Sequence, residues 1–376
     1  MPRLSFFIFC SMFFALSFGV AAMAALVPSI ATNFGVSLGS AMKLTWLYML
    51  PYGLVALIWA PLTRVTKVKR LLLFTSFGFF ISALCFSLSS TIGYAYLFRF
   101  LTGCFACGFV PLALITIGKT IPSHKKGKYI GTFFGVAYVS TFISVFLSGF
   151  LNWRVIYLIP SLLSLGVFIL VLTHLKDFDF RKPKFKISYL QTFKEKEALR
   201  FFLVIMLASF LYHGLQQRLG MYLHQQYSLQ QIAISAIFTV STLSAIIFEF
   251  SGGFLSSRLG NIKIAKIGFI LMSVFSLALF FIRDYKFIFV GIILWGSGWA
   301  LTHVGLSAHL TNFPDKILRD ASSLNSALRF SFGGLGAFMG GVLVSIANFK
   351  VLFIAVALSV FFLGFNLNKI ITVKTS

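Results

Sequence analysis

The chain has 376 residues, of which 59% are hydrophobic and only 11% are charged, and its net charge is +24. A soluble protein usually carries about a quarter charged residues, so much of this apolar surface must be solvated by lipid rather than hidden in one aqueous core. A net positive charge is typical of nucleic-acid-binding proteins. Here the basic residues lie between hydrophobic runs and form no continuous face, which argues against that class.

Twelve apolar runs follow one another along the chain, and each is close to the ~20 residues that an α-helix needs to cross ~30 Å of hydrocarbon. They cover 5–31, 41–62, 71–89, 94–117, 128–150, 154–174, 199–223, 231–256, 263–282, 286–312, 322–346 and 350–368. Because a segment in lipid must satisfy its own backbone hydrogen bonds, each run predicts a helix. The first run resembles a signal peptide but is too long for a cleavable core, so we expect it to remain as the first membrane helix.

Lys and Arg are distributed unevenly between the loops that join these runs. Every second loop is basic, as are both ends of the chain, whereas the loops on the other side contain only Arg154, Arg283, Lys286 and Lys350. Since basic loops remain in the cytoplasm, we predict a multi-pass protein of the inner (plasma) membrane with both termini cytoplasmic.

The most polar connection in the chain, 175–198, separates the first six runs from the last six. We therefore predict an all-α integral membrane protein whose twelve transmembrane helices form two six-helix bundles, 1–174 and 199–376. A basic cytoplasmic linker joins the two bundles.

The two halves resemble each other at an offset of 193 residues. This offset aligns Gly103 with Gly296, and it aligns the stretch 60–67 with 253–260. The repeat predicts that the two bundles are pseudo-symmetric, which is a common plan of transporters.

The stretch at the end of the eighth run resembles the loop signature of the major facilitator superfamily, G-x-L-x-D-R-x-G-R. Gly253, Arg258 and Gly260 match the signature, and Ser257 stands at the position of its acid. The resemblance implies the fold of that superfamily, alternating-access transport, and a role in gating for Gly253, Arg258 and Gly260.

Two further stretches extend the resemblance. Arg99–Gly103 is similar to the superfamily's R-x-x-x-G in the fourth helix. Pro28–Ala31 resembles the end of the first helix in bacterial drug and metabolite exporters of the drug:proton antiporter type. The acid that those exporters often place in the first helix is absent here, where the aligned stretch is Ala21–Met23.

Two charged residues inside predicted helices need a reason to be there, because an ion in the membrane is costly. The half of the chain that contains Arg99 offers it no carboxylate partner, since residues 1–176 contain no Asp or Glu. It is a candidate either for capping backbone carbonyls or for binding an anionic solute. Glu249 is the one acid clearly within a run; it is a candidate for pairing with a basic loop or for proton coupling.

Polar residues also gather on faces of the seventh and tenth runs. Ser209, His213, Gln216, Gln217 and Gly220 recur at helical spacing in the seventh run, which predicts a face toward a water-filled cavity or toward hydrogen bonds with other helices. Arg218 lies one residue off this face and is expected near the outer mouth. Trp299, His303 and Ser307 share a face of the tenth run, and a histidine there is a candidate for carrying a proton.

These candidates predict a cationic and neutral-polar cavity, and therefore a secondary transporter of a small anionic solute, an efflux permease for a metabolite such as a carboxylate siderophore. Multidrug or sugar efflux by proton antiport is an alternative. An integral-membrane enzyme or a transporter-like sensor is an alternative of another class. The sequence contains no metal-spaced cluster, no nucleophile–base pair and no nucleotide-binding signature, so we expect no enzyme activity, no metal and no cofactor. The expected partners are the solute, the bilayer and, as a candidate, protons; we expect a monomer and no nucleic acid.

Overall fold

The computed structural model describes residues 2–181, 189–313 and 315–371, and these residues form helices and no strand. The chain divides into two units, Met1–Ile187 (unit 1) and Ser188–Ser376 (unit 2). The middle of the predicted linker, 182–188, and the end of the chain, 372–376, lie outside the described residues.

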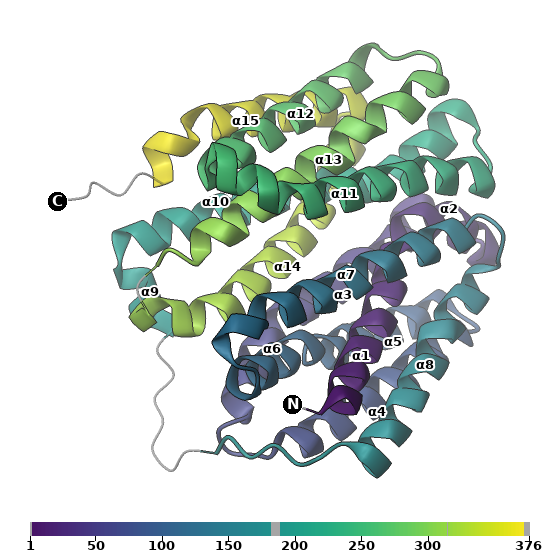
Figure 1. Cartoon of the computed structure of the whole chain (residues 1–376). Helices are drawn as coiled ribbons and strands as arrows, with labels where there is room; N and C mark the ends of the chain where they lie inside the picture. The colour runs from purple at the N-terminus through teal and green to yellow at the C-terminus, as the bar shows by residue number, and fades with distance from the viewer. Residues whose placement is uncertain (1, 182–188, 314, 372–376) are drawn as a thin grey trace. The chain divides into compact units, whose positions relative to one another are not determined.

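Unit 1 contains eight helices among its described residues (Figure 1). They are α1 (Arg3–Ala21), α2 (Met23–Phe34), α3 (Leu38–Leu62), α4 (Val68–Ser87), α5 (Ile92–Ala106), α6 (Phe109–Thr120), α7 (Ser123–Leu147) and α8 (Trp153–His174). The described part of unit 2 contains seven more. They are α9 (Tyr189–Lys194), α10 (Lys196–Tyr227), α11 (Gln231–Leu259), α12 (Asn261–Phe281), α13 (Tyr285–Leu310), α14 (Asp315–Ile346) and α15 (Phe349–Ile371). Twelve spans in the described chain are long and apolar enough to cross a membrane, which confirms the predicted number.

The two units share one packing plan. In unit 1, α1 packs on α7 and α8, α5 packs on α3 and α4, and α4 packs on α8. In unit 2, α10 packs on α14 and α15, α13 packs on α11 and α12, and α12 packs on α15. Each helix of unit 2 thus repeats the contacts of its counterpart in unit 1, and the predicted pseudo-symmetric six-helix bundles are confirmed.

Two glycines at equivalent positions of the internal repeat make equivalent contacts. A Cβ atom on Gly103 of α5 would overlap the backbone carbonyl oxygen of Tyr48 in α3. A Cβ atom on Gly296 of α13 would overlap the carbonyl oxygen of Ser241 in α11. Both members of the second pair lie 193 residues after those of the first. Two equivalent helix crossings therefore depend on the absence of a side chain, as is common for helices packed in lipid.

The first and fourth spans of unit 1 are interrupted, where the sequence predicts single helices. Helix α1 ends at Ala21 and α2 begins at Met23, and α5 and α6 are separated at Cys107 and Gly108. The corresponding spans of unit 2, α10 and α13, are continuous. An interruption frees backbone groups that must be bonded elsewhere in the protein, so unit 1 needs side chains that replace the lost helical hydrogen bonds.

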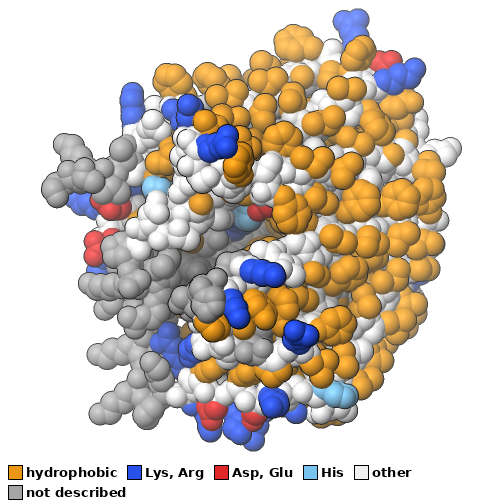
Figure 2. Space-filling model, in the orientation of Figure 1, with side chains coloured by type: hydrophobic (Ala, Val, Ile, Leu, Met, Phe, Trp, Pro, Cys, Tyr) orange, Lys and Arg blue, Asp and Glu red, His pale blue; other side chains and the backbone are white. Residues whose placement is uncertain are grey.

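Large apolar side chains also cover the outside of the helices. Phe281 is 69% exposed, and Phe74, Phe250 and Phe362 are likewise exposed on spanning helices. Figure 2 shows hydrophobic side chains over much of the viewed face. A soluble monomer rarely exposes so much contiguous apolar surface, whereas lipid solvates it.

The chain segment after α8 folds back onto unit 1. The Lys67 ammonium lies 2.8 Å from the Asp177 carboxylate, and the backbone N–H of Val68 donates to the carbonyl oxygen of Phe178 over 3.1 Å. Asp177 is the first acid in the chain. The loop between α3 and α4, which has Arg64 where the superfamily signature has an acid, therefore has an acidic partner from the start of the linker.

A second acid of this segment is engaged locally. The Arg181 guanidinium donates to both carboxylate oxygens of Asp179 over 2.9 and 3.0 Å from Nε, and this hydrogen bonding lowers the pKa of Asp179 to about 2. Lys119, at the end of α6, lies over the ring of Phe180 at 4.2 Å. Because these groups are exposed, each contact contributes little to stability.

We predict that Gly103→Leu destabilises the purified protein, because the new side chain must push α5 away from the backbone of α3. Overpacking of this kind costs about 1–3 kcal/mol. Thermal unfolding of the detergent-solubilised chain measures the effect. Gly118→Leu is the control, because a Cβ atom there meets nothing within 4 Å; equal melting temperatures for the two variants would contradict the close crossing.

Candidate functional site

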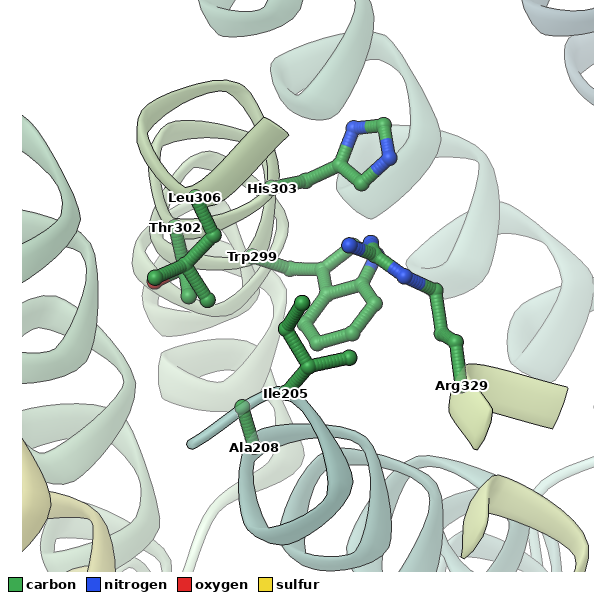
Figure 3. A pocket seen from close by; sticks show the side chains of 7 residues that line it. All are labelled: Ile205, Ala208, Trp299, Thr302, His303, Leu306 and Arg329. Carbon is green, nitrogen blue, oxygen red and sulfur yellow. The ribbon is translucent and has the colours of Figure 1, made fainter. Parts of the chain in front are cut away.

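A small pocket lies between three helices of unit 2 (Figure 3). Helix α10 contributes Ile205 and Ala208, α13 contributes Trp299, Thr302, His303 and Leu306, and α14 contributes Arg329. Trp299, His303 and Leu306 follow one another at spacings of four and three residues, which places them on one face of α13. The pocket thus combines an apolar wall with one permanent cation.

Trp299 lies between an aromatic ring and a cation. On one side, its indole stacks on Tyr212 of α10 with ring centroids 3.9 Å apart and an angle of 11° between the planes. On another side, the Arg329 guanidinium lies 5.6 Å from the indole centroid, as Figure 3 shows. Tyr212 also stacks on Trp295 at 5.1 Å, so a ladder of three rings holds the indole of Trp299 in place.

The polar face predicted for the seventh span supports this ladder. Trp295 donates from its indole N–H to the side-chain oxygen of Gln216 over 2.6 Å. His213 packs edge-on against Trp299 at 5.8 Å, and its Nδ1 lies 3.4 Å from the amide nitrogen of Gln217. His213, Gln216 and Gln217 therefore stand around the pocket, although none of them is among its lining residues.

His303 and Glu249 form an ion pair or hydrogen bond across two helices. Nδ1 of His303 in α13 lies 2.7 Å from Oε1 of Glu249 in α11, and the side chains are 25% and 16% exposed. The second carboxylate oxygen of Glu249 is buried and has no hydrogen-bond partner among the described residues. The partner of Glu249 is thus a histidine at the pocket and not a basic loop.

Arg99 occupies a closed site in unit 1. The side chain is 2% exposed, and both terminal nitrogens donate to the carbonyl oxygen of Gly19 over 3.2 Å. The rings of Tyr48, Phe86 and Tyr157 surround the guanidinium at 4.4, 5.4 and 4.9 Å. Gly19 lies just before the interruption at Ala22, so Arg99 supplies hydrogen bonds where the first span is broken.

Comparison with known proteins agrees with this arrangement. The family model described as Major Facilitator Superfamily matches residues 7–341. The chain belongs to the Major Facilitator Superfamily. It is also 29% identical over 154 residues to an uncharacterized protein of Aquifex aeolicus (strain VF5), a match that covers 39% of this chain and 40% of that protein.

Solved transporters share the fold at low sequence identity. A mutant of the nucleoside transporter NupG is 15% identical with a TM-score of 0.78, covering 98% of this chain and 100% of that chain. A bacterial homolog of the human lysosomal transporter Spinster, inward-facing and unoccupied, is 14% identical with a TM-score of 0.71 over 98% and 96%. A POT family transporter in complex with 5-aminolevulinic acid is 13% identical with a TM-score of 0.81 over 99% and 97%. These similarities show that the chain shares its fold with the three solved transporters.

The superfamily's loop motif lies at the turn between α11 and α12, away from the residues that line the pocket. Gly260 connects the two helices with φ of +90°, a backbone conformation that favours glycine. The Arg258 guanidinium lies over the ring of Phe254 at 4.2 Å, and a Cβ atom on Gly253 would meet nothing within 4 Å. In unit 2 the motif thus forms a tight turn, and its role in gating stays a prediction.

Arg218, expected near the outer mouth, is buried in unit 2. Its guanidinium donates to the carbonyl oxygen of Ala337 in α14 over 2.8 Å. A Cβ atom on Gly341 would overlap the same guanidinium. Arg218 therefore fixes α10 to α14 in the space left by a glycine.

Two residues that shape the pocket are not among the candidates drawn from the sequence. Arg329 is a cation inside an apolar run, and this position is the signal that identifies it as a candidate. Tyr212 carries no such signal, because a tyrosine in a membrane helix is ordinary. Its importance follows only from the two tryptophans that pack on it.

We predict that Arg99→Lys lowers the thermal stability of the protein. A lysine presents one compact ammonium in place of the planar fork, and the hydrogen bonds of a charged group are worth about 1.5–3 kcal/mol. Thermal unfolding of the purified variant tests this, with Arg283→Lys on an exposed loop as the control. The account of Arg99 fails if the two variants unfold at the same temperature.

Proposed function

We propose that the protein is a secondary transporter that exports a small organic anion by alternating access. The observation that carries the proposal is the pocket of unit 2, where the guanidinium of Arg329 lies among apolar and aromatic side chains in the spanning region. No carboxylate is among the residues that line it. A positive potential in a low-dielectric recess concentrates anions and repels cations.

The charged residues of unit 1 also favour an anionic substrate. Its spanning helices contain the buried cation Arg99 and no Asp or Glu, because the first acid of the chain is Asp177. A pathway for a cationic drug would be expected to contain a carboxylate, whereas an anionic solute meets no negative charge there. A POT family transporter of the same fold is found in complex with 5-aminolevulinic acid, so this fold can hold a small organic acid.

The direction of transport follows from the sign of the solute charge. One elementary charge that crosses a membrane potential of 100 mV changes its free energy by about 2.3 kcal/mol. A cell that is negative inside therefore drives a monoanion outward without a coupled proton. We place the protein in the inner (plasma) membrane as a monomer with both termini in the cytoplasm, because its basic loops lie on one side of the predicted topology.

The Glu249 carboxylate beside His303 opposes the positive potential of the pocket. The charged or titratable side chains around the pocket are Glu249 of α11, His303 of α13, Arg329 of α14 and, next to Trp299, His213 of α10. Removal of the negative charge of Glu249 makes the surroundings of the pocket more positive. A solute anion is then bound more tightly.

Multidrug or sugar efflux by proton antiport remains the second candidate for this chain. It is favoured by one observation, the unpartnered oxygen of Glu249 at the spanning helices, since a buried carboxylate is suited to carry a proton or to attract a cation. The sign of the solute charge distinguishes this candidate from anion export.

Uptake into everted membrane vesicles tests anion export. A potassium gradient with valinomycin makes the lumen positive, and the radiolabelled probes are citrate, benzenesulfonate and the cation phenyltrimethylammonium. We predict that at least one anion accumulates in vesicles that contain the protein, that accumulation disappears without the potential, and that the cation is excluded. Accumulation of the cation alone, or of no anion, would contradict the proposal.

We predict that Glu249→Gln increases anion uptake. The variant lacks the negative charge next to His303, so uptake at one fixed pH should rise by about threefold or more. Glu197→Gln is the matched control, because Glu197 is exposed at the start of α10. Unchanged uptake in Glu249→Gln would remove the pair from the mechanism.

A further inference from the structure

The pocket of unit 2 contains a slot between two aromatic rings. The indole of Trp299 and the imidazole of His303 lie one helical turn apart on α13, with their centroids separated by 6.5 Å and their planes inclined by 24°. Figure 3 shows both rings on the same side of the helix. A planar group packed between two rings needs about 7 Å, because carbon atoms in contact are separated by ~3.5 Å. The spacing is thus close to that of a three-layer stack with its middle layer absent.

Both rings of the slot are held by contacts with other helices. Tyr212 stacks on Trp299 at 3.9 Å, and Glu249 binds Nδ1 of His303 at 2.7 Å. Neither ring can rotate toward the other without loss of one of these contacts. The orientations of the two rings are therefore fixed, which lowers the cost of ordering side chains when a ligand binds.

The charges around the slot select the number and position of charged groups on a ligand. The Arg329 guanidinium lies 5.6 Å from the centroid of Trp299, one ring of the slot. The Glu249 carboxylate lies 2.7 Å from Nδ1 of His303, the other ring. A negative group beside Arg329 is stabilised, whereas a second negative group beside His303 would approach Glu249 and be repelled.

The rest of the lining is apolar and offers few hydrogen bonds. Ile205, Ala208 and Leu306 present only carbon atoms, and the hydroxyl of Thr302 is directed to the carbonyl oxygen of Ala265 in α12. A polyhydroxylated body would leave its own hydroxyl groups without partners against this wall, at a cost in binding.

We propose that the slot binds the planar, conjugated body of a small monoanion, stacked between Trp299 and His303 with its negative group on Arg329. This assignment rests on the proposed export of an organic anion and names the chemical class of the solute. A compact polycarboxylate or a polyol fits the pocket less well, although it would still satisfy the broader proposal.

Three sulfonates test the assignment, and two of them differ from benzenesulfonate in one property each. Sulfonates are suitable because they stay charged and do not cross bilayers unaided. Benzenesulfonate is planar with one charge, cyclohexanesulfonate is non-planar with the same charge, and 1,3-benzenedisulfonate is planar with two charges. Isothermal titration calorimetry on the full chain in lipid nanodiscs, with empty nanodiscs as the blank, measures their binding. We expect benzenesulfonate to bind about threefold to tenfold more tightly than cyclohexanesulfonate, and the disulfonate to bind more weakly than benzenesulfonate.

Substitutions then assign the binding to the slot. Arg329→Gln should weaken binding of benzenesulfonate by about tenfold or more. Trp299→Leu should remove the preference for the planar ring, and Glu249→Gln should recover binding of the disulfonate. Arg154→Gln is the matched control, because Arg154 also lies over a tryptophan, Trp153, at 4.5 Å, but outside the pocket. The Arg154→Gln variant should bind benzenesulfonate as tightly as the unmodified chain does.

Any of three results would overturn the assignment. The planar and non-planar monoanions bind equally well, benzenesulfonate does not bind, or its binding is unchanged in Arg329→Gln. Citrate uptake in vesicles together with such a result would leave anion export intact and reject only the planar slot. Binding of benzenesulfonate in the slot without uptake of any anion would instead reject export.

Discussion

Hydrocarbon offers no hydrogen bonds, so the backbone groups of each spanning helix of this protein must find their partners within the protein. Serine hydroxyls follow the same requirement. Ser140 and Ser144 of α7 donate to carbonyl oxygens of α1 over 2.6 Å, and Ser273 of α12 donates to Ala357 of α15 over 2.9 Å. The requirement that makes each span a helix thus also favours hydrogen bonds between helices of the same unit.

The rule acts differently on the two units. Unit 1 interrupts its first span and uses Ser144 and Arg99 to bond the carbonyl oxygens of Phe18 and Gly19 just before the break. Its buried cation is therefore part of the scaffold. Unit 2 keeps α10 and α13 continuous, and its polar side chains bond one another around a pocket instead. The units share a packing plan, but in unit 2 a cation, aromatic rings and an acid from different helices come together at this pocket.

The fold could be predicted from the sequence, whereas much less of the candidate site could. Hydrophobic length predicted twelve spans, and the alignment of Gly103 with Gly296 predicted an internal repeat. The structure adds that both glycines lie at equivalent close helix crossings. The interruption at Ala22 was not predicted, since nothing in the local sequence breaks a helix there. Glu249 and His303 were both candidates, yet their pairing depends on which faces of α11 and α13 meet, and such long-range contacts cannot be read from spacing along one chain.

The central claim is that Arg329 and the slot beside it receive the solute anion. A structure of the full chain with 4-iodobenzenesulfonate tests it most directly, because the iodine atom can be located by its scattering independently of the protein. The account predicts the sulfonate beside the Arg329 guanidinium and the ring between Trp299 and His303. Occupation of another site, such as the surroundings of Arg99, with the slot of unit 2 empty would contradict it.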